Sequence, residues 1–270
     1  MVSFDVHGKT AVITGAAGVI CGVMARELAQ KGVQVALLDL FPDKAQKVAD
    51  TIVAEGGMAF VVEANVLQRE SLEKARDEVL ARFDRVDILI NGAGGNKREA
   101  TTSPELRFFD LDPDAVRWVF DLNVTGAVLT TQVFGEVLAR QKSGTVINIA
   151  SMASILPLTN TVAYSGAKAA VSNFTQWMAV HFNQNYSTDI RVNAIAPGFL
   201  LTEQNRFLMQ REDGSPTDRG QRVLNKTPMG RYGEPEEMAG AIIWLASPAA
   251  SFVNGAVIPI DGGFSAFWGV

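Results

Sequence analysis

The sequence predicts a single doubly wound α/β domain of the Rossmann type, with about seven parallel strands and helices on both faces of the sheet. Short apolar runs alternate with longer segments of helical spacing, and glycine-rich turns follow two of those runs. Such an alternation is typical of a parallel sheet covered by its crossover helices. No linker, charge block or low-complexity segment divides the chain, so we expect one domain over residues 1–270.

The first strand–turn–helix–strand unit sets the pattern for the rest. Residues 10–14 and 33–39 are apolar runs, as expected for strands buried on both faces. The turn at 15–18 and a helical segment over 19–31 lie between them. Further strands are expected over 58–63, 86–91, 145–149, 191–196 and 256–260, and further helices over 43–55, 70–83, 112–140, 163–185 and 235–247.

Two connections interrupt this pattern, namely residues 96–111 and 200–227. They are long and polar for connections between a strand and a helix. Both follow the carboxyl ends of strands, where sheets of this kind bind their ligands. Long loops in that position often act as lids. We therefore expect these two loops to hold the substrate.

The composition narrows the possible partners. The formal net charge is −5 and no long basic stretch occurs, which argues against nucleic acid. The single cysteine, Cys21, excludes an intrachain disulfide and suits a reducing compartment. No apolar signal core precedes the first strand at residue 10, and no run of about 18 apolar residues occurs, so we expect a cytoplasmic protein with no membrane partner. Only His7 and His181 occur, far apart, so no metal site is expected.

The turn at 15–18 has features of a dinucleotide site. Gly15 and Gly18 allow the backbone to approach a pyrophosphate, whose charge is favoured at a helix N-terminus. Asp39 can accept hydrogen bonds from an adenosine ribose and would repel a 2′-phosphate. Ala16 and Leu40 offer no cation to such a phosphate. We expect NAD rather than NADP, the alternative being that the glycines only form a tight turn and Asp39 is a solvated strand end.

Three polar residues could meet at a strand end. Tyr164 and Lys168 share a helix face, and Ser151 follows a buried strand. Free tyrosine has a pKa of about 10, and a cation about 4 Å away contributes roughly 4 kcal/mol, enough to lower that pKa by about 3 units. Lys168 is the expected cation, and Ser151 would stabilise charge on the substrate oxygen. Alternatively, Tyr164 is a core tyrosine and Lys168 a solvated helix lysine.

These spacings resemble the short-chain dehydrogenase/reductase family over nearly the whole chain. Ser151, Tyr164 and Lys168 meet the S-x12-Y-x3-K signature, residues 91–94 are similar to the N-A-G turn, and residues 197–198 and 261–263 match the P-G motif and the usual close of the last strand. The resemblance implies that Asn123 holds a water for proton relay, although it could simply bend its helix. Thr202 would hold the nicotinamide carboxamide, cap the next helix, or do both.

The resemblance also implies a full set of coenzyme-binding residues. These are Gly15, Gly18, Val19, Ile20, Asp39, Leu40, Asn65, Val66, Asn91, Ala93, Gly94, Tyr164, Lys168, Pro197, Gly198, Phe199 and Thr202.

The chain departs from the family in the T-G-x-x-x-G-x-G turn. Val19 and Cys21 stand where the second and third glycines normally occur. A Cβ at position 19 would crowd the pyrophosphate unless the turn shifts. This altered turn, together with the Gly-Gly-Asn sequence at 94–96, resembles the sugar-acid members of the family, the mannonate (fructuronate) oxidoreductases.

We therefore expect an NAD-dependent interconversion of a secondary alcohol and a ketone on a sugar acid such as D-mannonate/D-fructuronate. A carboxylate favours a cation in a closed site, and the candidate substrate residues are Asn96, Lys97, Arg98, Ser151 and Arg206. The alternatives are a 3-oxoacyl-thioester reductase, which normally prefers NADPH, and a non-catalytic dinucleotide sensor. Related enzymes are often homotetramers, and the apolar tail at 264–270 would be costly to expose.

Overall fold

Seven strands form one sheet in the computed structural model, which describes residues 2–202 and 205–269. Their order is β3-β2-β1-β4-β5-β6-β7, and every neighbouring pair is parallel. The bounds are β1 Thr10–Thr14, β2 Gln34–Asp39, β3 Met58–Glu63, β4 Ile88–Asn91, β5 Gly144–Ile149, β6 Ile190–Pro197 and β7 Val257–Ile260. The predicted doubly wound class is confirmed. Because the strand order reverses between β1 and β4, a crevice is expected at their carboxyl ends.

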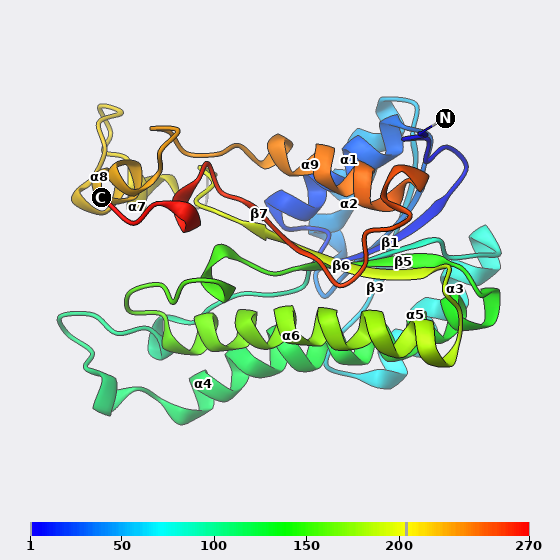
Figure 1. Cartoon of the computed structure of the whole chain (residues 1–270), viewed down its shortest axis with the longest axis horizontal. Helices are drawn as coiled ribbons and strands as arrows, with labels where there is room; N and C mark the ends of the chain where they lie inside the picture. The colour runs from blue at the N-terminus through cyan, green and yellow to red at the C-terminus, as the bar shows by residue number, and fades with distance from the viewer. Residues whose placement is uncertain (1, 203–204, 270) are drawn as a thin grey trace.

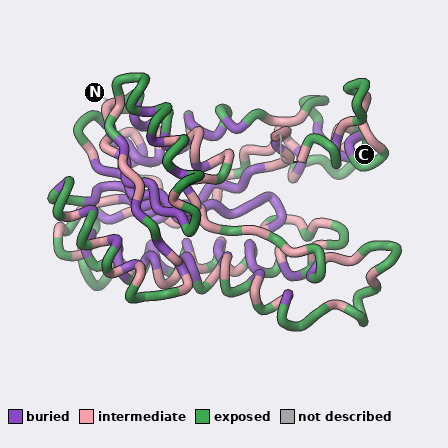
Figure 2. Tube along the Cα trace, turned by 180° about the vertical axis from the view of Figure 1, so that it is seen from behind, coloured by how far each residue is buried: buried purple, intermediate pink, exposed green. Residues whose placement is uncertain are grey.

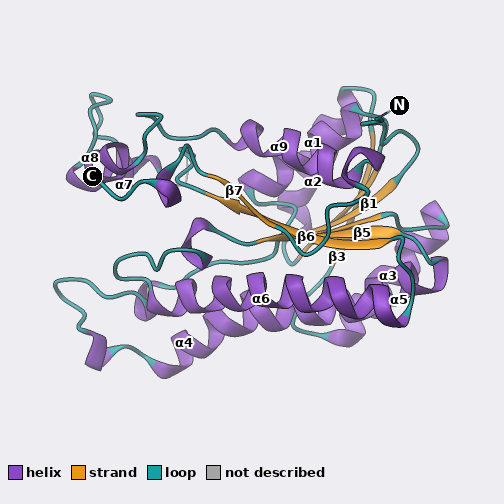
Figure 3. Cartoon of the chain, viewed as in Figure 1, coloured by secondary structure: helices purple, strands orange, loops and turns teal. Residues whose placement is uncertain are grey.

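Helices cover both faces of this sheet (Figures 1 and 3). Three of them, α1, α2 and α9, lie on one face, and α3, α4, α5 and α6 lie on the other. Their bounds are α1 Val19–Gln30, α2 Pro42–Ala54, α3 Arg69–Phe83, α4 Pro113–Phe120, α5 Gly126–Gln141, α6 Val162–Asn185 and α9 Ala239–Ala246. None of the helices in the described part of the chain combines the length and apolar character needed to cross a bilayer.

The core consists of two apolar layers, one on each side of the sheet. Side chains of a strand alternate between the two faces, and β1 shows this directly. Ala11 and Ile13 pack with α1 and α9 in one layer, whereas Val12 packs with α5 and α6 in the other. Burial is therefore concentrated along the strands, as Figure 2 shows in purple. This rigid double layer holds the strand ends in place around the crevice.

The structure corrects the prediction that residues 200–227 form a loop. This segment contains two helices, α7 Arg206–Met209 and α8 Asp218–Lys226. Thr217 caps α8, because its hydroxyl accepts a hydrogen bond from the Gly220 amide at 3.0 Å. Residues 203 and 204 lie outside the described residues. The segment at 96–111 has only the short 3-10 turns Arg98–Ala100 and Phe108–Asp110.

The predicted helix over residues 112–140 is also more complex than expected. It consists of α4, a π-helical turn at Asp121–Thr125 and α5. Short π-helical turns of this kind are frequent at functional sites, and this one contains Asn123. A hydrophobic period close to that of a continuous helix does not reveal such an insertion.

Candidate active site and coenzyme cleft

A cleft of about 840 Å³ lies at the carboxyl ends of the strands. Most of the residues expected to bind a coenzyme line it. These are Gly15, Gly18, Val19, Ile20, Asp39, Leu40, Asn65, Val66, Ala93, Gly94, Gly198, Phe199 and Thr202. The other four expected residues, Asn91, Tyr164, Lys168 and Pro197, lie outside the lining of this cleft. Its volume and its lining from several strand ends suit an extended ligand such as a dinucleotide.

Two glycine turns meet at the floor of the cleft. Gly15 has a φ of +65°, and a Cβ placed there would lie 2.8 Å from the Cα of Ala93. The Thr14 hydroxyl accepts hydrogen bonds from the amides of Gly92 and Ala93, at 3.1 and 3.2 Å. The turn after β1 is thereby tied to the turn after β4. The two turns pack so closely that no side chain at position 15 would fit between them.

Cys21 shows how the altered turn is accommodated. The thiol is buried, and a Cβ on Gly92 would lie only 2.2 Å from its sulfur. Cys21 stands where the family has a glycine, and the missing side chain at position 92 makes room for it. Burial raises the pKa of Cys21 to about 12, so the thiol stays protonated and is not a nucleophile at neutral pH. Helix α1 begins at Val19, which lines the cleft.

Asp39 lines the cleft at the carboxyl end of β2. Its two carboxylate oxygens accept hydrogen bonds from the amides of Ala17 and Phe41, each at 2.9 Å. The carboxylate is therefore held between the first glycine turn and the start of α2. Lys44 and Phe41 line the same cleft, with the Lys44 Nζ 4.8 Å from the centre of the Phe41 ring. Sequence reasoning missed this cation because it considered only positions 16 and 40.

Ser151, Tyr164 and Lys168 come together beside the end of β5. The Ser151 Oγ accepts a hydrogen bond from the Ala153 amide at 3.1 Å, which fixes the turn after the strand. The Lys168 Nζ donates to the carbonyl of Ile149 at 2.7 Å and lies 5.7 Å from the centre of the Tyr164 ring. Ile149 also lines the cleft, so the three polar groups lie next to the coenzyme space.

The environment of these groups shifts their proton affinities. Burial raises the pKa of Tyr164, and a hydrogen bond with Ser151 opposes the rise. Burial also lowers the pKa of Lys168 to about 8. Lys168 was expected to lower the pKa of Tyr164, whereas in this structure burial raises it. The phenol is thus held in its protonated form at neutral pH, the form that a general acid requires.

Asn123 connects the π-helical turn to the second glycine turn. Its buried amide nitrogen donates to the carbonyls of Gly95 and Val119, at 2.7 and 2.8 Å. Its amide oxygen accepts from the Gly95 amide at 3.3 Å. A Cβ on Gly94 would lie 2.6 Å from that oxygen and 3.2 Å from the Lys168 Nζ. Asn123 therefore holds the second glycine turn in place and lies close to Lys168.

Asn91 lies beneath the cleft rather than in it. Its amide nitrogen donates to Thr131 and to Asn148, at 2.9 and 2.8 Å. Asn148 in turn donates to the Thr175 hydroxyl at 2.8 Å. This buried chain of hydrogen bonds joins β4 and β5 to helices α5 and α6, so Asn91 orders the sheet end that carries the second glycine turn.

The expected substrate residues are more dispersed. Asn96 is exposed and donates to the Thr101 hydroxyl, and Arg206 is exposed and donates to Gln210. The Lys97 Nζ lies 4.5 Å above the ring of Trp118, and Arg98 is exposed. None of these four is among the residues lining the cleft. Ser151 is the one expected substrate residue that lies beside Tyr164.

Two further expectations concern Thr202 and metal ligands. Thr202 lines the cleft, but the N-cap of α7 is Asn205, whose side chain accepts from the Thr202 amide at 2.9 Å. The Thr202 hydroxyl is therefore not the cap of that helix. Across residues 2–202 and 205–269, no group of three or more His, Cys, Asp or Glu side chains is placed to hold a metal ion.

The chain is similar to known oxidoreductases over nearly its whole length. Residues 15–265 match the family model described as enoyl-(acyl carrier protein) reductase. The uncharacterized oxidoreductase UxuB of Bacillus subtilis (strain 168) is 49% identical over 275 residues, which cover 98% of each chain. A Haemophilus influenza protein provisionally assigned as a D-mannonate oxidoreductase, solved with bound NAD, is 46% identical with a TM-score of 0.93 over 98% of each chain. A Burkholderia cenocepacia J2315 gluconate 5-dehydrogenase, solved with NADP and tartrate, is 30% identical with a TM-score of 0.86 over 98% of each chain.

Proposed function

The chain belongs to the short-chain dehydrogenase/reductase family and is an oxidoreductase of that family, and from this premise we propose that it interconverts a sugar-acid ketone and its secondary alcohol with NAD(H), D-fructuronate and D-mannonate being the proposed pair. The observation that carries the reaction type is the placement of Tyr164, Ser151 and Lys168 beside a cleft that has Asp39 at its other end. A sensor without catalysis would not require a buried tyrosine and lysine at this point.

The residues of the chain suit proton transfer to a ketone oxygen. The Tyr164 hydroxyl, protonated at neutral pH, donates its proton to that oxygen, and Ser151 adds a hydrogen bond that stabilises the developing charge. The tyrosinate left behind is favoured by the positive charge of Lys168, which is held in place by the Ile149 carbonyl. When bound, the nicotinamide coenzyme supplies or accepts the hydride. In the oxidation direction the same residues act in reverse.

The residues also fit the coenzyme. A side chain at position 15 would clash with the backbone of Ala93 and Gly92, so Gly15 allows the two glycine turns to meet at the cleft, where backbone amides suit a pyrophosphate. The Asp39 carboxylate at the adenosine end favours a ribose hydroxyl over a 2′-phosphate, which supports NAD over NADP. The similarity to a protein solved with bound NAD supports the same preference. Gly15, Gly18, Asp39 and Thr202 are the residues we assign first to coenzyme binding.

The sugar-acid substrate rests on two supports. One is the altered turn with the Gly-Gly-Asn sequence at 94–96. The other is the 46% identity to the protein provisionally assigned as a D-mannonate oxidoreductase. The test is a substrate panel with purified protein and NADH or NADPH. Reduction of D-fructuronate with NADH at a kcat/KM above that for uncharged ketones and 3-oxoacyl thioesters is the expected result. If fructuronate is left untouched while an uncharged ketone is reduced, the substrate proposal fails.

The Tyr164→Phe variant tests the mechanism separately. We expect turnover to be abolished while NADH binding, followed by the fluorescence of the coenzyme, stays close to that of the wild-type protein. Tyr186→Phe is a matched control, because Tyr186 ends α6 far along the same helix and is exposed. Unchanged turnover in Tyr164→Phe would remove Tyr164 from the mechanism.

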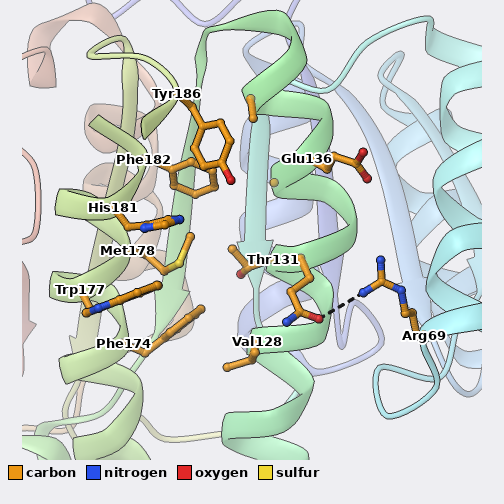
Figure 4. A pocket seen from close by; sticks show the side chains of 13 residues that line it. Arg69, Val128, Thr131, Glu136, Phe174, Trp177, Met178, His181, Phe182 and Tyr186 are labelled. Carbon is orange, nitrogen blue, oxygen red and sulfur yellow. Dashed lines mark hydrogen bonds between the residues drawn. The ribbon is translucent and has the colours of Figure 1, made fainter. Parts of the chain in front are cut away.

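We also propose a cytoplasmic homotetramer. Helix α6 exposes Trp177 and Val180, and a groove of about 530 Å³ lies between α5 and α6 (Figure 4). In this groove the rings of Trp177 and His181 stack with their centres 4.6 Å apart. In the tail, Phe264 is buried against Phe199, while Trp268 is exposed and Val270 lies outside the described residues. A monomeric mass by light scattering would overturn the tetramer.

A further inference from the structure

Lys44 occupies a distinctive position in the coenzyme cleft. It lies in the first turn of α2, is exposed, and lines the cleft together with Asp39, Leu40 and Phe41. Its Nζ rests 4.8 Å from the centre of the Phe41 ring. Because Phe41 follows β2 by two residues, this cation stands by the end of β2, where the adenosine is proposed to bind, whereas Tyr164 lies beside the end of β5.

The charge of Lys44 is available to a ligand. Asp39 is its acidic neighbour in the cleft lining, but both Asp39 oxygens are already bonded to backbone amides. Among the described residues, none of the ion pairs within 4.0 Å involves Lys44. A cation–π contact at an exposed site contributes little, and the lysine stem is flexible. The ammonium group can therefore leave the Phe41 ring to meet an anion beside Asp39.

We propose that Lys44 is a coenzyme-specificity residue that makes this cleft tolerate a 2′-phosphate, so that the enzyme uses NADP(H) as a weaker second coenzyme. A phosphate monoester carries about −1.5 to −2 charges at neutral pH. The Asp39 carboxylate repels it, and the Lys44 ammonium offsets that repulsion. The ribose hydroxyl of NAD(H) is neutral, so Lys44 has little effect on that coenzyme. The inference rests on the proposed nicotinamide-coenzyme function and refines it.

The matched variants are Lys44→Gln and Lys47→Gln. Both lysines are exposed on α2, but Lys47 does not line the cleft. NADH and NADPH dissociation constants are measured by coenzyme fluorescence, and kcat/KM for each coenzyme is measured with the substrate identified in the panel. Lys44→Gln removes an exposed charge-assisted contact with the 2′-phosphate, so we expect the dissociation constant of NADPH to rise roughly 3- to 10-fold. NADH binding should stay within about twofold in both variants, and Lys47→Gln should match the wild type.

A second pair of variants provides an internal check. Asp39→Ser should strengthen NADPH binding, and adding Lys44→Gln to it should reverse part of that gain. Equal losses for NADH and NADPH in Lys44→Gln, or no loss for NADPH, would overturn the role of Lys44. If NADPH is preferred outright by the wild-type protein, the proposed NAD preference fails, while the Lys44→Gln ratio still tests this inference. Because the binding measurement needs no substrate, failure of the sugar-acid proposal leaves it intact.

Discussion

Gly92→Ala is the substitution for which the structure predicts the clearest consequence. An added Cβ would lie 2.2 Å from the Cys21 sulfur and 2.7 Å from the Thr14 carbonyl oxygen. Both distances are far below van der Waals contact. The carbonyl belongs to the central strand β1, so it cannot move without disturbing the sheet. The clash is therefore expected to weaken both the fold and the coenzyme turn.

The magnitude follows from the two contacts. Overpacking in a tightly packed site costs about 1–3 kcal/mol, and a clash with two partners places Gly92→Ala at the upper end, at about 3 kcal/mol. In the Cys21→Ala background the nearest atom of residue 21 would be its Cβ, 3.7 Å away, which is ordinary contact. Only the Thr14 contact then remains. We expect a coupling energy of about 1–2 kcal/mol between the two positions.

The assay is a double-mutant cycle of urea unfolding on the wild type, both single variants and the double variant, without coenzyme. Gly95→Ala is the control for adding a methyl group to the same turn, because its Cβ would lie 3.6 Å from the nearest atom, in Leu122. It should change the free energy of unfolding by less than about 1 kcal/mol. The reasoning would be refuted if Gly92→Ala cost the same in the wild-type and Cys21→Ala backgrounds.

Two further predictions concern charged groups. The pKa of Lys168 in the folded protein is about 8, below the ordinary value of 10.5. Between pH 8 and pH 10.5 the unfolded chain therefore binds more protons at this group than the folded protein does. The free energy of unfolding should rise by about 3 kcal/mol from this group as the pH increases through that range. Urea unfolding at about pH 7.5, 9 and 10.5 should show this rise in the free energy of unfolding of the wild type, and a smaller rise in Lys168→Met. Equal dependence on pH in the two proteins would contradict the prediction. Arg191 donates to the carbonyls of Leu245, Ser247 and Val253 near the end of α9, so Arg191→Met should lower the free energy of unfolding by about 2 kcal/mol and Arg191→Lys by less. If Arg191→Met unfolded at the same midpoint urea concentration as the wild type, the prediction would fail, because water would then satisfy these carbonyls as well as the guanidinium does.

The sequence alone was enough for the class of fold and for the grouping of the reactive residues. Buried parallel strands must be almost continuously apolar, and this signal is local, so the strand at 10–14 was predicted with the bounds of β1. Tyr164 and Lys168 share a helix face because of their spacing, and Ser151 follows a strand that the same signal identifies. These inferences depend on short apolar runs and on a spacing of about four residues, which the chain carries without reference to distant segments.

Only the tertiary structure decided which distant residues share space. Gly92 makes room for Cys21, although 71 residues separate them. Lys44 reaches the cleft because α2 starts beside Asp39, and Asn96 and Arg206 turn to neighbours instead. Helix α8 was missed because most of its residues are polar, and its position depends on packing of Val223. Steric fit and side-chain direction depend on the packing of many elements at once, which is the physical reason that no local pattern encodes them.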